Sequence, residues 1–218
     1  MKDFTDISII LDRSGSMESV RSDTIGGFNA FLAEQQKAGD NAALSLYQFD
    51  DHYDVVCSNK VLSQVDKLDD QTFQPRGMTA LYDAIGRTIK STGARFAAMP
   101  ESERPDKVVL VIMTDGLENA SREFDALQVG ELIREQTNVY NWEFVFIGAN
   151  QDAILSARDL NIPMAKAITY AADAAGTADV YASVSATLLN KRSGAAPEMA
   201  FTRADRAKQE RGVHKSGT

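Results

Sequence analysis

Two kinds of segment alternate along the chain, and this alternation restricts its fold more than any other feature. Short apolar runs, such as 7–11 and 108–113, are separated by longer segments whose apolar residues recur every three or four positions. Strands that alternate with helices form a parallel sheet with helices packed on both faces. We therefore predict an α/β protein with a doubly wound, Rossmann-like sheet.

The pattern predicts the individual elements. Strands are expected at about 5–12, 43–49, 53–57, 107–114, 143–148 and 165–169. Helices are expected at about 19–38, 79–98, 122–137, 151–159 and 177–191. The second and third strands are separated only by Asp50-Asp51-His52, so they must form an antiparallel hairpin. The polar stretch 58–76 is predicted to be a surface loop.

Length and composition indicate one large domain with a tail. The chain has 218 residues, of which 44% are hydrophobic and 25% charged, as in an ordinary globular protein. We place the domain at residues 1–192 and the tail at 193–218. Two interpretations of the tail stay open: a short helix capped by Thr202-Arg203-Ala204-Asp205, with Phe201 just before the cap, or a frayed end.

Several classes of protein do not fit this sequence. No apolar run approaches the roughly 20 residues that span a bilayer. The net charge of -8 opposes binding to nucleic acid. Cys57 is the only cysteine, which excludes an intramolecular disulfide and a cysteine-based zinc site. The first residues lack the long apolar region of a secretion signal, so we expect a cytoplasmic protein. The oligomeric state is not predicted.

Oxygen-bearing side chains follow two of the predicted strands. Asp12 ends the first apolar run and begins the sequence Asp12-Arg13-Ser14-Gly15-Ser16, and Asp115 follows the run 108–114. Both should emerge at the carboxyl edge of the sheet, where such sheets bind ligands. Thr79 lies at the start of a predicted helix. Each residue alone is explained as a helix cap or a turn residue, but together they offer an oxygen shell suited to Mg²⁺ or Mn²⁺.

These motifs resemble the metal-ion-dependent adhesion site of von Willebrand factor A (vWA) domains, whose pattern is Asp-x-Ser-x-Ser, then Thr, then Asp. The resemblance covers about residues 4–192. It implies a six-stranded, mostly parallel sheet in the order 3-2-1-4-5-6 with one antiparallel edge strand. It also implies that Asp12, Ser14 and Ser16 ligate the ion, with Thr79 and Asp115 bound directly or through water. Mg²⁺ is the expected ion, with Mn²⁺ and Ca²⁺ as alternatives.

The resemblance implies a non-catalytic, metal-dependent module that binds an Asp or Glu carboxylate of a protein partner. The chain is similar to stand-alone bacterial or phage members of the family, some of which work beside AAA-type ATPases. Extracellular adhesion, the best-known role of the family, would need a signal or anchor. Partner binding shifts the last helix in some members, here 177–191.

An enzyme is the other interpretation, namely a metal-dependent phosphatase or nucleotide-processing enzyme that uses Asp12. Aspartyl-phosphate phosphatases need a second carboxylate two residues after the nucleophile, where this chain has Ser14. A serine hydrolase is disfavoured because the chain lacks the Gly-x-Ser-x-Gly motif and a plausible histidine base. His52 and His214 are too far apart in the sequence to suggest a catalytic pair.

Three further loops should lie at the same edge of the sheet and form the rim of the site. Their polar residues are Asp50, Asp51 and His52, then Glu118 and Asn119, and then Asn150, Gln151 and Asp152. Each of these residues is either a contact to the partner or a solvated turn residue.

Overall fold

A six-stranded sheet forms the centre of the computed structural model, which describes residues 3–149 and 153–213. The strands are β1 (Thr5–Asp12), β2 (Ala42–Phe49), β3 (Tyr53–Val61), β4 (Lys107–Thr114), β5 (Glu143–Ala149) and β6 (Ala167–Tyr170). Their order is β3-β2-β1-β4-β5-β6. β3 pairs antiparallel with β2, whereas the other neighbouring pairs are parallel. The predicted strand order and antiparallel edge strand are confirmed.

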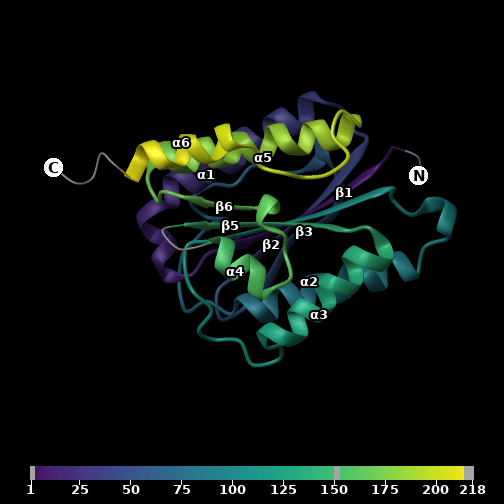
Figure 1. Cartoon of the computed structure of the whole chain (residues 1–218), viewed down its shortest axis with the longest axis horizontal. Coiled ribbons are helices and arrows are strands. Elements are labelled where there is room, and N and C mark those ends of the chain that lie inside the picture. Colours follow the sequence, from purple (N-terminus) through teal and green to yellow (C-terminus); the bar gives the residue numbers. More distant parts are fainter. Residues whose placement is uncertain (1–2, 150–152, 214–218) are drawn as a thin grey trace.

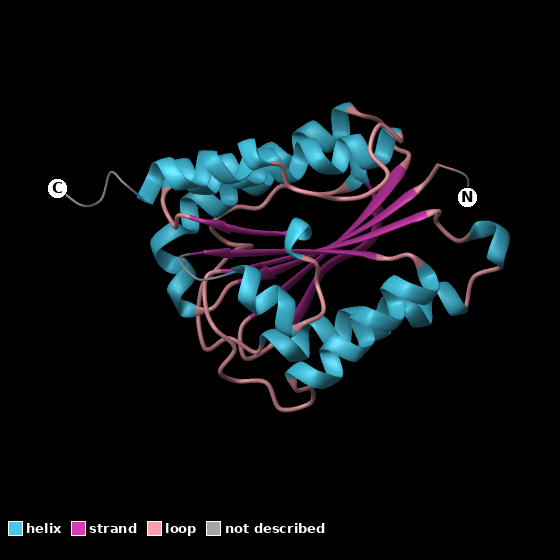
Figure 2. Ribbon diagram, in the orientation of Figure 1, coloured by secondary structure: helices cyan, strands magenta, loops and turns pink. Residues whose placement is uncertain are grey.

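Helices cover both faces of the sheet (Figures 1 and 2). α1 (Arg21–Lys37), α5 (Ala174–Ser193) and α6 (Arg203–Val213) lie on one face. α2 (Leu81–Ala97), α3 (Ala126–Tyr140) and α4 (Ala153–Asp159) lie on the other. Short 3-10 turns occur at Gly15–Val20, Leu62–Gln64, Glu101–Glu103 and Met164–Lys166. Among the described residues, no helix combines the length and apolarity that crossing a bilayer requires.

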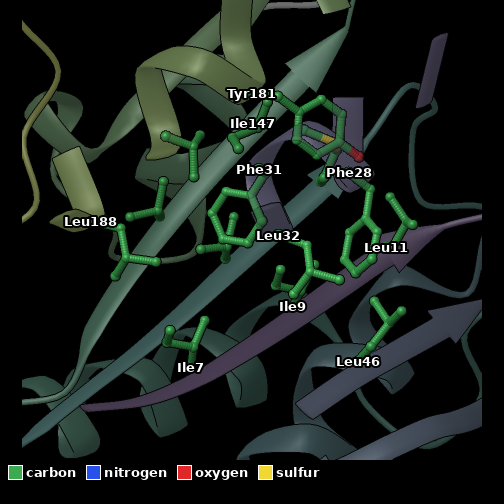
Figure 3. Packing of buried hydrophobic residues seen from close by; sticks show 14 of the residues in the cluster. Ile7, Ile9, Leu11, Phe28, Phe31, Leu32, Leu46, Ile147, Tyr181 and Leu188 are labelled. Carbon is green, nitrogen blue, oxygen red and sulfur yellow. The ribbon is translucent and has the colours of Figure 1, made fainter. Parts of the chain in front are cut away.

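The core consists of two layers because every residue of β1 is buried and successive side chains point to opposite faces. Ile7, Ile9 and Leu11 belong to the cluster beneath α1 and α5, whereas Ile10 belongs to the cluster beneath α2 and α3. Figure 3 shows the first cluster, where Tyr181 of α5 meets the aromatic side chains of α1. This packing fixes the sheet between its helices and thereby the positions of the loops at its carboxyl edge.

The predicted loop at 58–76 was wrong at its beginning. β3 continues to Val61, and a 3-10 turn follows at Leu62–Gln64. Asn59 has a positive φ of 51° within this strand, and its N–H donates to Ser45 Oγ at 2.9 Å. The irregular register of β2 and β3 lets polar residues continue an edge strand, which the alternation of apolar residues does not reveal.

The segment after α5 packs against the domain. Met199 is fully buried and Phe201 is 7% exposed. Thr202 and Asp205 bond reciprocally at the start of α6, because Asp205 N–H donates to Thr202 Oγ1 at 3.1 Å and Thr202 N–H donates to Asp205 Oδ2 at 2.8 Å. The capped helix therefore describes residues 203–213 better than a frayed end does, while the domain boundary at residue 192 stays a prediction.

Candidate metal centre

The loop after β1 is held in place mainly by backbone hydrogen bonds. Arg13 N–H donates to Phe49 O at 2.8 Å, and Gly15 N–H donates to Gly77 O at 3.2 Å. Ser14 N–H donates to Asp12 Oδ1 at 2.7 Å. These bonds tie the Asp12–Ser16 loop to the end of β2 and to the segment that precedes α2.

The five predicted ligand side chains lie together. Ser14 Oγ is 3.2 Å from Ser16 Oγ, and Ser16 Oγ donates to Asp115 Oδ1 at 2.6 Å. Thr114 Oγ1 donates to Asp12 Oδ2 at 2.6 Å, which links the ends of β1 and β4. A Cβ built on Gly116 would lie 3.1 Å from Thr79 Oγ1 and 3.7 Å from Ser16 Oγ, so Thr79 belongs to the same group.

The spacing of these oxygens suits a small divalent ion. Adjacent ligands of an octahedral Mg²⁺ shell, with bonds of about 2.0–2.1 Å, lie about 3 Å apart. The serine and aspartate oxygens, 2.6 and 3.2 Å apart, are close to that separation. Asp12, Ser14 and Thr79 are buried, whereas Ser16 is exposed and Asp115 is partly exposed. The donor set therefore fits a hard cation that is open to solvent on one side.

The two carboxylates lie in surroundings that favour added positive charge. Burial raises the pKa of Asp12 to about 6, although hydrogen bonds from Thr114 and Ser14 oppose this, and the nearby Asp115 raises it further. Burial also raises the pKa of Asp115. Arg13 follows Asp12 in sequence, but its guanidinium turns away to Asp50 at 3.0 Å and Asp54 at 2.5 Å.

Asp50 does not lie on the rim of the site as predicted, but inside the protein, where it holds other residues in position. It is fully buried. Its Oδ2 accepts from Arg13 Nε at 3.0 Å and Arg76 Nε at 2.8 Å, and its Oδ1 accepts from His52 N–H at 2.5 Å. Its backbone oxygen also accepts from Ala80 N–H at 2.9 Å. Asp50 thus connects the Asp12–Ser16 loop, the β2–β3 hairpin and the segment around Thr79.

Glu118 and Asn119 also turn toward the protein. Glu118 Oε2 accepts from Tyr82 N–H at 2.9 Å, and Glu118 Oε1 accepts from Ser121 N–H at 2.7 Å. Asn119 Oδ1 accepts from Thr79 N–H at 2.9 Å. In return, the side chain of Asp83 in α2 accepts hydrogen bonds from the backbone N–H groups of residues 122–124 in the loop. These bonds fasten the loop after Asp115 to the first turn of α2.

Two of the remaining rim residues face solvent. Asp51 and His52 are exposed. Together with Asp50 they place ligand atoms within 4.8 Å of one another, a second group that could hold a metal ion. The two arginines on Asp50 make this group a poorer cation site than the one around Asp12. Asn150, Gln151 and Asp152 lie outside the described residues.

Comparison with known proteins identifies the family. Residues 6–180 match the model of the von Willebrand factor type A domain, so the chain belongs to this family. No curated protein sequence matched the chain.

Solved structures share the fold. One is proximal thread matrix protein 1 from the mussel byssus, with zinc at its MIDAS motif, the metal-ion-dependent adhesion site. It has a TM-score of 0.59 and 15% identity, over 85% of this chain and 46% of the matrix protein chain. Manganese-loaded Plasmodium vivax TRAP protein has a TM-score of 0.58 and 15% identity, over 92% of this chain and 75% of the TRAP chain. The pilus adhesin SpaC from Lactobacillus rhamnosus GG has a TM-score of 0.65 and 13% identity over 86% and 30%. The chain thus spans less than half of the matrix protein and of the adhesin.

Proposed function

We propose that this vWA domain is a metal-dependent protein-binding module whose ion is held by Asp12, Ser14, Ser16, Thr79 and Asp115. The observation that supports this most is that two carboxylates and three hydroxyls from separate loops lie together. The guanidinium of Arg13, in the same loop as Asp12, turns away from them to Asp50. The solved structures with zinc at a MIDAS motif and with manganese are of proteins that share this fold. Mg²⁺ is the ion we propose, because the donors are all oxygen.

The donor set explains how a partner would be recognised. An ion bound mainly by uncharged hydroxyls keeps positive charge and exchangeable water, which favours a carboxylate from a partner. Asp12 lies beneath the site and is held by Ser14 and Thr114, so it neutralises part of the charge from the buried side. Ser16 is on the exposed side, where an Asp or Glu of the partner would approach.

The residues around Asp12 offer little to a phosphatase. Ser14 occupies the position of the second carboxylate, and its N–H and hydroxyl are turned to Asp12 and Ser16. His52 is exposed and lies beside Asp50 and Asp51. His214 lies outside the described residues. We therefore propose a non-enzymatic role, in keeping with the adhesin and matrix proteins that share the fold.

A melting experiment tests the metal site. At a concentration ten times its dissociation constant, Mg²⁺ should stabilise the protein by about 1.4 kcal/mol, which corresponds to roughly 3–6 °C for a domain of this size. EDTA should reverse the shift. Asp12→Ala should abolish it, whereas the control Asp66→Ala, at a carboxylate 90% exposed, should keep it. Equal Mg²⁺ responses of wild type and Asp12→Ala would refute the site.

Capture of proteins from the source cell tests the binding function. Partners should be retained in Mg²⁺ and released by EDTA, and Asp115→Ala should retain them poorly. A cytoplasmic location and an AAA-type ATPase partner are proposals that rest on the resemblance to stand-alone members of the family. Retention that is unchanged in EDTA would show that another surface binds the partner.

A further inference from the structure

A small cleft lies beside the metal centre, between the loop after β4, the start of α2, and α4. Leu81, Phe146 and Leu160 line it and are buried, and Leu117 and Ser156 line it as well. Its volume is about 210 Å³. Pockets for whole small molecules are larger, about 300–1,000 Å³. The cleft therefore has the size for one side chain rather than for a free ligand.

The cleft and the metal centre share a wall. Gly116 lines the cleft, and it follows Asp115 directly. A Cβ built on Gly116 would come within 3.1 Å of Thr79 Oγ1 and 3.7 Å of Ser16 Oγ. Leu81 lines the cleft two residues after Thr79. A residue next to one that is bound at the ion is thus within reach of the cleft.

Two large apolar side chains are exposed beside this wall. Leu117 is 68% exposed and Met78, which precedes Thr79, is 52% exposed. Large apolar side chains that flank a binding site are typical of protein interfaces, in which methionine is enriched. Met78 directly precedes Thr79 and Leu117 lies two residues after Asp115, so a partner held at the ion would cover both.

The charges at the cleft disfavour an acidic occupant. Asp159 lines it with its side chain 66% exposed, and its ion pair with Arg158 is 3.8 Å long. Glu118 also lines it, with both carboxylate oxygens already bonded to residues of the loop and of α2. A second carboxylate beside the one at the ion would meet like charge here, whereas an apolar side chain would bury the surface of Leu117.

We propose that the partner presents one acidic residue followed or preceded by a large apolar residue, whose side chain enters the cleft over Leu117 while the carboxylate binds at the ion. This rests on the proposed function of the metal centre and specifies its partner. A run of acidic residues is the wrong partner, because only one carboxylate meets positive charge.

Three blocked heptapeptides test this, identical except that the central Glu is flanked by Leu, by Ser or by Glu. Binding is measured by NMR of methyl-labelled protein in Mg²⁺ and in EDTA. In Mg²⁺ the Leu-flanked peptide should bind about threefold to tenfold more tightly than the Ser-flanked one, because it buries an additional apolar side chain. The Glu-flanked peptide should bind no more tightly than the Ser-flanked one. The methyl signals of Leu117 and Leu81 should shift with the Leu-flanked peptide.

Two variants separate the cleft from the ion. Leu117→Ser and Ser156→Phe, which fills the cleft, should bring the ratio of the Leu and Ser peptides close to one while leaving metal-dependent binding of the Ser peptide. Leu127→Ser is the matched control, since Leu127 is 71% exposed on α3 and does not line the cleft. Its ratio should equal that of wild type.

The outcomes distinguish the two proposals. Equal, metal-dependent binding of the Leu and Ser peptides to wild type would overturn the cleft proposal and leave carboxylate binding standing. A preference for Leu that persists in both cleft variants would also overturn it. Failure of all three peptides to bind in Mg²⁺ at millimolar concentration would overturn carboxylate capture itself.

Discussion

Two adjacent glycines of α1 should respond in opposite ways to alanine. A Cβ built on Gly26 has no neighbouring atom within 4 Å. A Cβ built on Gly27 would lie 2.2 Å from Cδ2 and 2.7 Å from Cε2 of Tyr181 in α5. Tyr181 is 4% exposed and packs against the aromatic side chains of α1, so its ring must shift to admit the new Cβ. Gly27 is therefore a point of close approach between the two helices, while Gly26 is open.

The magnitudes follow from this difference. Alanine within a helix is favoured over glycine by about 0.5–1 kcal/mol, so Gly26→Ala should stabilise the protein by that amount. Gly27→Ala has the same helix gain but adds overpacking, which costs about 1–3 kcal/mol. The helix contribution cancels between the two variants, so their difference measures the overpacking alone. It corresponds to melting temperatures about 2–12 °C apart.

Urea unfolding of wild type, Gly26→Ala and Gly27→Ala, all in EDTA, measures the difference without metal linkage. The urea midpoint of Gly26→Ala should lie above that of wild type. The midpoint of Gly27→Ala should lie below that of Gly26→Ala by an amount that corresponds to the overpacking cost, and the slopes of all three transitions should be equal. Equal midpoints for the two variants would refute the close contact of α1 with Tyr181.

Three further predictions concern the C-terminal segment and the site. Glu143→Gln should destabilise by about 3 kcal/mol at neutral pH, because Lys166 and Lys191 lose a buried counter-charge. Burial raises the pKa of Glu143, but Lys191, the Met199 N–H and Lys166 outweigh it and lower the pKa. The loss of stability should therefore be complete above the pKa of glutamate in the unfolded chain, about 4.3, and should shrink as the pH falls through the lower pKa of the folded protein. Urea unfolding at several pH values measures this, and the exposed control Glu131→Gln should show neither the loss nor its pH dependence. Gly116→Ala should fold normally yet lose most of the calorimetric Mg²⁺ signal, since its Cβ would crowd Thr79 Oγ1. Screens with phosphatase, esterase and nucleotide substrates should show no turnover; turnover lost in Asp12→Asn but kept in Thr79→Ala would instead favour the phosphatase.

The sheet was predictable because its signals are local. Each central strand is a run of apolar residues buried on both faces, as in β4, where Val108–Thr114 are all buried. The grouping of Asp12, Ser14 and Ser16 was predictable for the same reason, since they follow a strand on one short turn. Thr79 and Asp115 needed the fold as well, because parallel strands bring their loops to one edge.

The support of the site was not predictable, because it depends on contacts between distant segments. Asp50 has the sequence context of a solvated hairpin turn, yet it is buried between Arg13 and Arg76. Glu118 likewise has the context of a polar loop, yet it caps the first turn of α2 through Tyr82. Arg13, Arg76 and Tyr82 are all distant in sequence from the carboxylates that they contact, whereas the bonds within each turn alone would leave both carboxylates in water.

This support explains why the loops at the metal centre are suited to binding. Each loop is tied to its neighbours by hydrogen bonds within the protein, through Arg13 and Asp50 on one side and through Asn119 and Thr79 on the other. An ion that binds loops held by such bonds has few residues to order, so more of its interaction energy is retained as affinity. The same bonds leave Ser16, Met78 and Leu117 exposed. For the proposed metal centre, one network of hydrogen bonds would therefore support the ion from beneath and leave apolar side chains beside it exposed to a partner.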